Sequence, residues 1–413
     1  MTGDDAGTAA RPEPLRRFVP LALLKPALAA ALGIDGGPLF QILAVEDLSL
    51  SAAAIGTAFG LGLLSLPVQV WAARLPLHRA RRNLQLFLVV AAIQALILAG
   101  LISVGATGGL AATALVITVT AEISISVLFT TAWQPLLSTR TRSVDRQRLN
   151  AFWSAMGRGL LAGVLVIFAA VNVAGRAVVL IALAAAAVAI AVQLRRVVAG
   201  DPPPVPATPT APRPVPEKAP LAPAMIWILA SFTLINFASL PMWLVYLAEV
   251  SWPDANLALV GAVQTAAVVA ALLAWRSTDG PVGRRVIAGT LVLLAGSAAL
   301  LTVGGTVAGL REQVTVFAVS AAIAAGSTYA SIALLEAAHR LVSAENSVRS
   351  FTLLDVVDSS SLQFGLFAGG LLVTVSTVGQ PISPYVIFVV GTSLAAAVVI
   401  GITVRLHPGS AAS

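Results

Sequence analysis

The sequence contains no cysteine, and this absence excludes disulfide bonds, thiolate metal sites and cysteine nucleophiles. Histidine is scarce. The three histidines, His78, His339 and His407, show no spacing with acidic residues that is typical of a metal site or a catalytic triad. A phosphate-binding loop with a Lys-Ser or Lys-Thr pair is also absent, so we expect no ATP-driven step in this chain. These absences favour a protein that is not an enzyme and that holds neither a metal nor a cofactor.

Charged residues make up only 10% of the 413 residues, against about 25% in a soluble domain, while 58% are hydrophobic. A core of ordinary size cannot bury so many apolar side chains, so we expect a lipid bilayer around most of the surface. The formal net charge of +7 does not indicate a nucleic-acid partner, because the basic residues lie in short loops between apolar segments.

Apolar segments long enough to cross a hydrocarbon layer of about 30 Å follow one another along nearly the whole chain. Backbone groups in lipid need hydrogen-bond partners within their own segment, so these segments are predicted to be helices. The fold class that we predict is therefore an all-α membrane protein. We place twelve spans at 18–44, 51–73, 83–104, 110–136, 149–174, 177–194, 223–247, 257–275, 286–304, 314–338, 350–375 and 384–404.

A proline-rich stretch from Ala199 to Pro220 divides the spans into two groups of six. So many prolines forbid helix and sheet, and they indicate a semi-extended linker. We predict a tail, a six-helix bundle, a linker, a second six-helix bundle and a second tail, at 1–17, 18–198, 199–222, 223–405 and 406–413.

Arginine is concentrated in the loops after the even-numbered spans, whereas the loops after the odd-numbered spans carry most of the acidic residues. Positive charge stays on the cytoplasmic side of a membrane, so both termini are predicted to be cytoplasmic. The Ala- and Arg-rich composition looks bacterial. We therefore expect a multi-pass protein of the bacterial plasma (inner) membrane.

The two groups of spans repeat one pattern. The segment PLFQILAVE at 38–46 matches PMWLVYLAE at 241–249, with a proline, an aromatic residue two positions later and a glutamate eight positions later. In the spans that follow, Gly56 corresponds to Gly261. A repeat at this period in so apolar a chain indicates one half-bundle followed by a copy, and the proline in each segment is predicted to bend its span.

Three stretches, LSLSAAAIG before the second span and the loops RLPLHRARR and RSTDGPVGRR after spans 2 and 8, resemble the major facilitator superfamily of transporters. The loop signature of the superfamily is a glycine, then Asp-Arg, a glycine and an arginine pair. The residues that match it are Arg81, Arg82, Asp279, Gly283, Arg284 and Arg285. The stretch AMGRGLLAG in the fifth span lacks the proline of export-type members, and the fourth span lacks the early arginine of many drug–proton antiporters. The resemblance implies two six-helix bundles in parallel repeat and secondary transport by alternating access.

Ionisable residues inside the spans carry the functional hypotheses, because each costs about 2.5–3.5 kcal/mol in hydrocarbon. Glu122 and Arg158 fall near mid-depth of the fourth and fifth spans, and Asp35 lies in the first. We interpret Glu122 as a proton-titrating or substrate-binding carboxylate tuned by Arg158, with Asp35 as a second candidate. The alternative is a permanent Glu122–Arg158 pair that locks two spans together. Asp355 and Asp358 begin the eleventh span and are interpreted as charges near a helix N-terminus.

Four uncharged side chains are candidates for lining a substrate cavity: Asn236, Trp243, Tyr246 and Gln264. Trp243 and Tyr246 also fit an aromatic belt at the membrane interface. Small apolar residues with few charges suit an amphipathic substrate, so we predict proton-coupled export of a small organic molecule (a drug or metabolite) by a monomer. Proton-coupled uptake of an organic solute is the alternative, and a polytopic sensor or scaffold without transport is a third interpretation.

Overall fold

The computed structural model describes most of the chain. Several predicted features lie outside the described residues, among them Asp35, Asp279, both chain ends and residues 200–222 of the linker. The described residues are 19–32, 37–72, 77–140, 143–199, 223–239, 241–277, 281–303, 307, 309–341, 347–377, 380 and 382–406.

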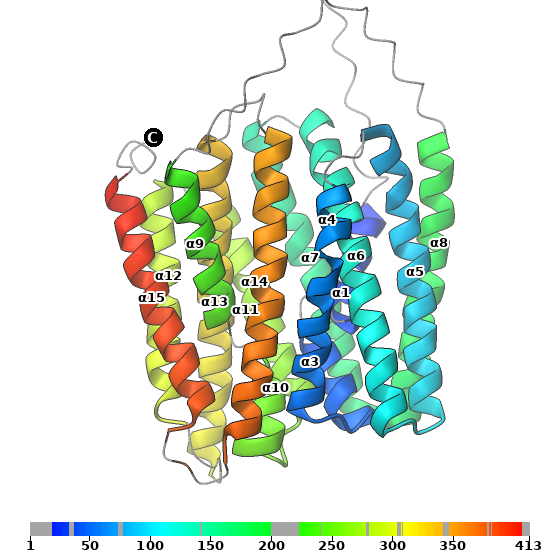
Figure 1. Ribbon diagram of the computed structural model, residues 1–413, viewed down its shortest axis with the longest axis vertical. Helices are drawn as coiled ribbons and strands as arrows, with labels where there is room; N and C mark the ends of the chain where they lie inside the picture. The colour runs from blue at the N-terminus through cyan, green and yellow to red at the C-terminus, as the bar shows by residue number, and fades with distance from the viewer. Residues whose placement is uncertain are drawn as a thin grey trace, which may run out of the picture.

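Every secondary-structure element in these ranges is a helix (Figure 1). The first half, as we call it, contains α1 (Val19–Leu32), α2 (Pro38–Ile42), η2 (Leu43–Asp47), α3 (Ala52–Gly62), η3 (Leu63–Ser65), α4 (Leu66–Ala72), α5 (Leu77–Ser103), α6 (Gly108–Arg140), α7 (Ser143–Ala170) and α8 (Val173–Ala199). The second half contains α9 (Pro223–Ala238), α10 (Trp243–Tyr246), η4 (Leu247–Ser251), α11 (Leu257–Ser277), α12 (Val282–Leu300), α13 (Leu310–Leu341), α14 (Ser347–Val375) and α15 (Pro384–Leu406).

Ten helices in the described part are long and apolar enough to cross a membrane, and shorter apolar helices cover Val19–Ala29 and Ala52–Val68. The long helices run side by side along one common direction (Figure 1). The all-α membrane class is therefore confirmed, and the chain is a multi-pass membrane protein. The number twelve stays a prediction, because the first two spans correspond to the two shorter helices.

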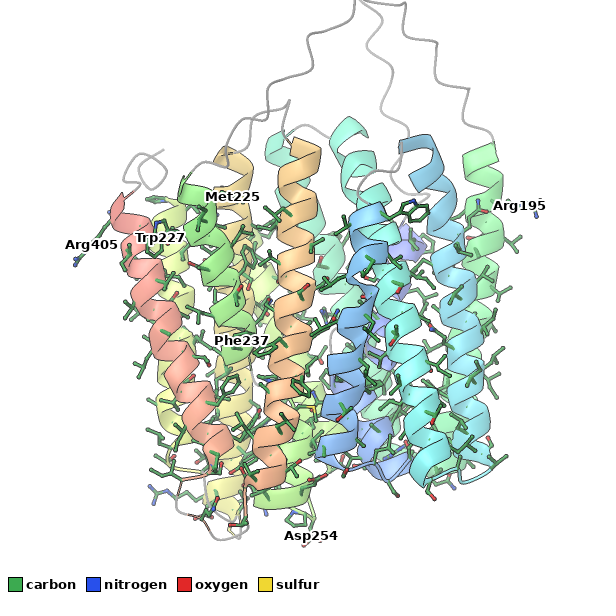
Figure 2. All side chains as sticks on the ribbon, viewed as in Figure 1. Arg195, Met225, Trp227, Phe237, Asp254 and Arg405 are labelled. Carbon is green, nitrogen blue, oxygen red and sulfur yellow. The ribbon has the colours of Figure 1, made fainter. Side chains whose placement is uncertain are left out.

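The two ends of the bundle can be told apart by the direction of the chain. The upper end in Figure 1 is where α8 ends, α9 begins and α15 ends. Arg195 and Arg405 lie at this upper end, whereas Asp254 lies at the lower end (Figure 2). The orientation predicted from the loop charges makes the upper end cytoplasmic.

The repeated segments fold alike at the lower end. Pro38 opens α2, which continues into the π-helix η2, and Pro241 precedes α10, which continues into the π-helix η4. Proline has no backbone N–H to donate a hydrogen bond within a helix. Met242, beside Pro241, adopts a left-handed backbone conformation with a φ of 66°. The hydroxyl of Tyr385 donates to the carbonyl oxygen of Pro241 at 2.6 Å. The predicted bend at Pro241 is confirmed, and π-turns of this kind are frequent at functional sites.

Small residues recur every four positions at Ala155, Gly159 and Gly163 on α7 and at Gly365 and Gly369 on α14, and this spacing in the sequence predicts close helix packing. A Cβ built on Gly365 would lie 3.0 Å from the ring of Phe237, and one on Gly369 would lie 3.0 Å from a backbone oxygen, so α14 packs closely there as predicted. The same prediction for Gly159 and Gly163 on α7 is wrong, because both are exposed and no described atom of another helix lies within 4 Å of a Cβ built on either. The regular spacing of small residues does not show which face of a helix packs against another helix.

The two halves pack on each other mainly through two helix pairs. α3 packs against α14, and α7 packs along α11. The larger buried apolar core draws its side chains from both halves. Any site between the halves is therefore bounded by these helices.

Candidate functional site between the two halves

Glu122 is an acidic residue in the interior of the first half, with 0% of its surface exposed. It lies about 21 Å along α6 from Gly108 at the lower end. The half-buried Arg158 lies about 18 Å along α7 from Ala170, also at the lower end. The two residues therefore lie at similar depths, as predicted. That they act as a pair stays a prediction.

A polar group inside the second half joins α9 to α14. The Nδ2 of Asn236 donates to the Oδ1 of Asp358 at 2.7 Å, to the backbone oxygen of Asp358 at 3.2 Å and to the Oγ of Ser361 at 2.9 Å. Asp358 lies about 17 Å inside α14, beyond the first turn over which a helix dipole acts. The N-terminal interpretation of Asp358 is therefore wrong, and the side chain of Asp355 is not described. Sequence reasoning missed this pair because the partners are 122 residues apart.

Trp243 and Tyr246 belong to a packed aromatic layer near the lower end. Trp243 is 1% exposed and donates from Nε1 to the Oγ of Ser320 at 2.8 Å. Tyr246 is 0% exposed, accepts a hydrogen bond from Ser383 at 3.2 Å, and stacks on Tyr385 with ring centroids 4.8 Å apart. Side chains buried in this way do not form an interfacial belt. A substrate could reach them only if the layer opened, so their role in a cavity stays a prediction.

Two side chains bind backbone groups of the opposite half at the lower end. The Oε1 of Gln41 accepts a hydrogen bond at 3.0 Å from the N–H of Leu244, near the N-terminus of α10. The Oε1 of Glu249 accepts one at 2.7 Å from the N–H of Ala52, the first residue of α3. Each bond satisfies a helix N-terminal donor that has no partner within its own helix. The two halves thus cap each other's helices.

Glycines allow the backbones of the two halves to touch at the same end. A Cβ built on Gly56 of α3 would lie 3.0 Å from the Cα of Gly370 of α14. A Cβ built on Gly261 of α11 would lie 2.7 Å from the Cβ of Pro38 of α2. Gly56 and Gly261 are the corresponding glycines of the sequence repeat, so the repeat supplies both close contacts. Gln264, half-buried one turn after Gly261, lies on the same helix, and its role as a substrate contact stays a prediction.

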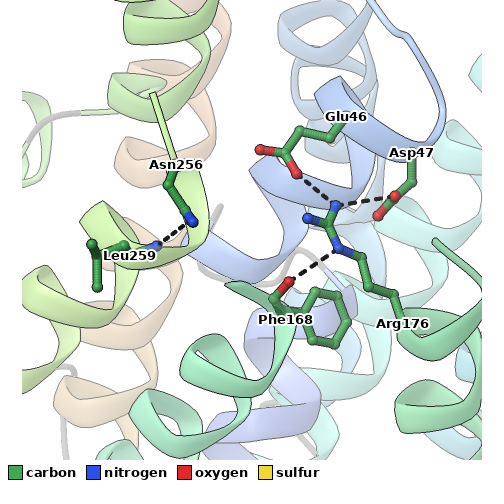
Figure 3. A network of polar contacts seen from close by, with 6 residues as sticks. All are labelled: Glu46, Asp47, Phe168, Arg176, Asn256 and Leu259. Carbon is green, nitrogen blue, oxygen red and sulfur yellow. Dashed lines mark hydrogen bonds and ion pairs between the residues drawn. The ribbon is translucent and has the colours of Figure 1, made fainter. Parts of the chain in front are cut away.

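A charged group of Glu46, Asp47 and Arg176 lies where η2 ends and α8 begins, and Figure 3 shows its contacts. Arg176 forms an ion pair with Glu46, contacts the Oδ1 of Asp47 through Nη1 at 3.1 Å, and donates from Nε to the backbone oxygen of Phe168 at 3.4 Å. Asp47 is only 8% exposed. Burial raises the pKa of Asp47 above its ordinary value, although the charge and hydrogen bond of Arg176 oppose this shift.

Replacing Arg176 by Gln should make the stability of the protein more dependent on pH. An acid whose pKa is higher in the folded state loses stability as pH rises from the unfolded-state pKa through the folded-state pKa. Without Arg176 the pKa of Asp47 rises further, so we expect the melting temperature to fall most near neutral pH and to approach that of the wild type under acidic conditions. Thermal unfolding between about pH 4 and pH 8 measures this. Arg311→Gln, at an exposed arginine of the lower end, is the control. An equal fall of the melting temperature at every pH would show that Arg176 does not act through the pKa of Asp47.

No protein-family model and no curated protein sequence matches the chain. Solved structures match over almost its whole length. A POT family transporter in complex with a thioalcohol-conjugated peptide has a TM-score of 0.68 at 12% identity, with 96% of each chain covered. FucP, a Major Facilitator Superfamily transporter in the outward conformation, has a TM-score of 0.62 at 13% identity, with 95% of this chain and 98% of the other covered. A bacterial homologue of the iron transporter ferroportin, in an outward-facing state, has a TM-score of 0.59 at 14% identity, covering 94% and 99%.

This is the major facilitator fold. At these identities the likeness establishes the fold and leaves the substrate open. The three proteins compared are transporters.

The second copy of the loop motif lies at the upper end of this major facilitator fold. The Nη1 of Arg285 lies 3.3 Å from the Oε2 of Glu336, and its guanidinium lies 4.4 Å from the ring centroid of Trp275. Gly283 is buried and Arg284 is exposed. The motif arginine therefore ties α12 to α13 and α11 within the second half. The remaining motif residues lie outside the described side chains: Asp279, Arg81 and Arg82.

Proposed function

We propose that this protein is a secondary active transporter that works by alternating access and couples export of a small organic molecule to the inward movement of protons. The observation that carries the proposal is the set of contacts between the halves at the lower end. The contacts there include two hydrogen bonds and two close glycine contacts between the halves, and none of them is covalent. Such an interface can open and close as a unit.

The position of the Gln41–Leu244 bond supports a rocking motion of the two halves. Its partners are 203 residues apart, and the same interval separates Pro38 from Pro241. Equivalent positions of two repeats can touch only near the axis that relates them, so this bond lies near the pseudo-two-fold axis. A single hydrogen bond contributes about 0.5–1.5 kcal/mol, which is small enough to be broken in each transport cycle.

Glu122 supports the proton as the coupling ion. An ionisable group within the membrane is costly and marks ion or proton pathways more often than packing alone. Glu122 is buried at the depth where α6 passes the middle of the bundle, and Arg158 reaches a similar depth on α7. We propose that Glu122 takes up and releases the proton and that Arg158 or the substrate competes for the carboxylate in one of the two states.

The proposed orientation puts the upper end in the cytoplasm of a bacterium, with the protein working as a monomer in the plasma membrane. The arginines Arg195, Arg276 and Arg405 lie at the ends of helices that reach the upper end, whereas Asp47 and Asp254 lie at the lower end. The positive-inside rule places such arginines on the cytoplasmic side of the membrane.

Flux into proteoliposomes under an imposed pH gradient tests the proposal. The compounds would be a panel of small organic molecules that includes thionine, methylene blue, ethidium and tetracycline, with protein-free vesicles as the control. We expect saturable movement of at least one compound against the direction of proton flow. Movement together with the protons would favour the uptake alternative. If well-folded protein moved no compound on the panel, the sensor or scaffold interpretation would replace transport.

Replacing Glu249 by Ala should open the lower end. The substitution removes the acceptor that caps Ala52 across the interface, and loss of a helix cap costs about 1 kcal/mol, or roughly a five-fold change in the ratio of closed to open states. Spin labels at Val104 and Leu310, which are exposed at the lower end of opposite halves, report this change as a longer mean distance. Glu249→Gln keeps an acceptor and should restore closure. Glu46→Ala, at the repeat-related glutamate that binds within its own half, should leave the distance unchanged; an equal effect of both alanine variants would refute the cross-half role.

A further inference from the structure

Gln363 on α14 faces the first half at the junction between the halves. The residue is 1% exposed. A Cβ built on Gly62 of α3 would lie 3.6 Å from the Oε1 of Gln363 and 2.7 Å from the Cδ1 of Ile123 of α6. The carboxamide of Gln363 therefore sits against α3, close to where α6 also packs.

The side-chain oxygen of Gln363 accepts no hydrogen bond from any residue that the structure describes, although it is buried. Leaving such an acceptor unsatisfied is unfavourable, and native structures contain few such atoms. Gln41 shows the contrast, because its own Oε1 accepts the cross-half bond from Leu244. An unsatisfied acceptor kept in a buried position needs a reason other than stability.

A second buried polar atom on the same side of α14 also has no described hydrogen-bond partner. The Oγ of Ser360 is buried and has no hydrogen-bond partner among the described residues. Residues three apart lie on one side of a helix, so Ser360 and Gln363 point in similar directions. α14 also packs against η3, the 3-10 segment Leu63–Ser65 that interrupts the second span of the first half. A 3-10 segment in the middle of a helix often marks a hinge.

Gln363 and Glu122 lie in one layer of the bundle. Gln363 is about 18 Å along α14 from Val375, and Glu122 is about 21 Å along α6 from Gly108, both measured from the lower end. Gln363 belongs to the second half, whereas Gly62 and Glu122 belong to the first. A molecule bound at Gln363 would contact both halves and could favour one arrangement of them over the other.

We propose that Gln363 is a substrate-binding residue whose side-chain oxygen accepts a hydrogen bond from an O–H or N–H group of the transported molecule. This inference rests on the proposed transport function and adds the chemical class of the substrate. A neutral carboxamide oxygen has no charge to offer, so it selects a donor group rather than an ion. The substrate class is therefore a small amphipathic molecule that carries a hydroxyl, amine or amide donor.

Two dyes with the same ring system test this assignment. Thionine carries two NH₂ groups, whereas methylene blue carries dimethylamino groups in the same places and has no N–H donor. We expect the wild type to carry thionine with a lower KM than methylene blue. In Gln363→Met, which keeps the length of the side chain and removes the acceptor, the KM for thionine should rise about tenfold. The KM for methylene blue and both maximal rates should stay unchanged.

Thermal stability separates a substrate role from a structural one. Replacing an unsatisfied polar group by an apolar group of similar shape is neutral or stabilising, so Gln363→Met should melt at the wild-type temperature or above it. Gln94→Met is the matched control. The Oε1 of Gln94 is likewise buried without a described partner, but its Nε2 donates to the Thr118 backbone oxygen within the first half. This variant should therefore lose stability and keep its KM for thionine.

The remaining outcomes distinguish the inference from the function on which it rests. If the wild type carries other panel compounds but does not prefer thionine, or if Gln363→Met leaves the KM for thionine unchanged, the assignment of Gln363 is overturned. A lower melting temperature of Gln363→Met with an unchanged KM would assign the acceptor to a structural water instead. If the wild type moves no compound at all, the proposed transport function itself fails.

Discussion

Transport driven by a pH gradient should fall to the background of protein-free vesicles when Glu122 is replaced by Gln. The substitution keeps the shape of a side chain that is 0% exposed and removes its ability to bind and release a proton. Exchange of labelled for unlabelled substrate, which needs no net proton movement, should continue. Flux with and without an imposed gradient, compared with counterflow in the same vesicles, measures the difference.

Glu336→Gln is the matched control for this experiment. Glu336 is also a buried glutamate, but it pairs with Arg285 near the upper end of the second half. Breaking a buried ion pair is destabilising, so this variant should melt at a lower temperature and should keep the dependence on the gradient. If Glu122→Gln kept gradient-driven flux at the wild-type rate, Glu122 would be a structural partner of its neighbours, as in the alternative interpretation.

Replacing Gly370 by Ala should prevent closure of the lower end and abolish most transport. The added Cβ would lie 2.7 Å from the backbone oxygen of Ala52 and 2.7 Å from the Cα of Gly56. Both are backbone atoms that cannot rotate away, so α3 and α14 must move apart. Overpacking of this kind costs about 1–3 kcal/mol, which corresponds to roughly a 5- to 150-fold change in the ratio of closed to open states. Substrate flux and the distance between the lower-end spin labels would both report the change.

Gly391→Ala provides the control for the glycine experiment. Gly391 lies on α15, and a Cβ built there meets no described atom within 4 Å. This variant should transport and melt like the wild type, because alanine also has the higher helix propensity. Wild-type flux in Gly370→Ala would show that the contact between α3 and α14 is not required for the cycle.

The sequence repeat predicted the organisation of the fold because its prolines and glycines each impose a local constraint on the backbone. Pro38 begins a short helix that becomes a π-helix, and Pro241 lies two residues before another, since proline fixes its own backbone φ angle wherever it occurs. Gly56 and Gly261 each provide a close contact between the halves, because only glycine lacks the atom that would clash. Such effects depend on a few neighbouring residues and can be read without knowing the fold.

Side-chain contacts between helices that are distant in the sequence could not be predicted in the same way. The Asn236–Asp358 bond requires the rotation of α9 against α14, and periodicity alone does not give that rotation. Gly159 and Gly163 illustrate the same limit, because their spacing suits helix packing while their face of α7 meets no described helix. Trp243 and Tyr246 were predicted as cavity or belt residues from their type, whereas their burial follows from the bend that inserts them among α13 and α15.

Distances between the halves at both ends test alternating access most directly. Because the chain has no cysteine, cysteines introduced for spin labels are the only labelling sites. One doubly labelled protein would carry labels at Val104 and Leu310 near the lower end, and a second at Arg195 and Arg405 near the upper end. We predict that double electron–electron resonance finds two populations for each pair, and that conditions which lengthen the lower distance shorten the upper one. Single distributions that stay the same at every pH and with every transported compound would contradict the alternating-access account.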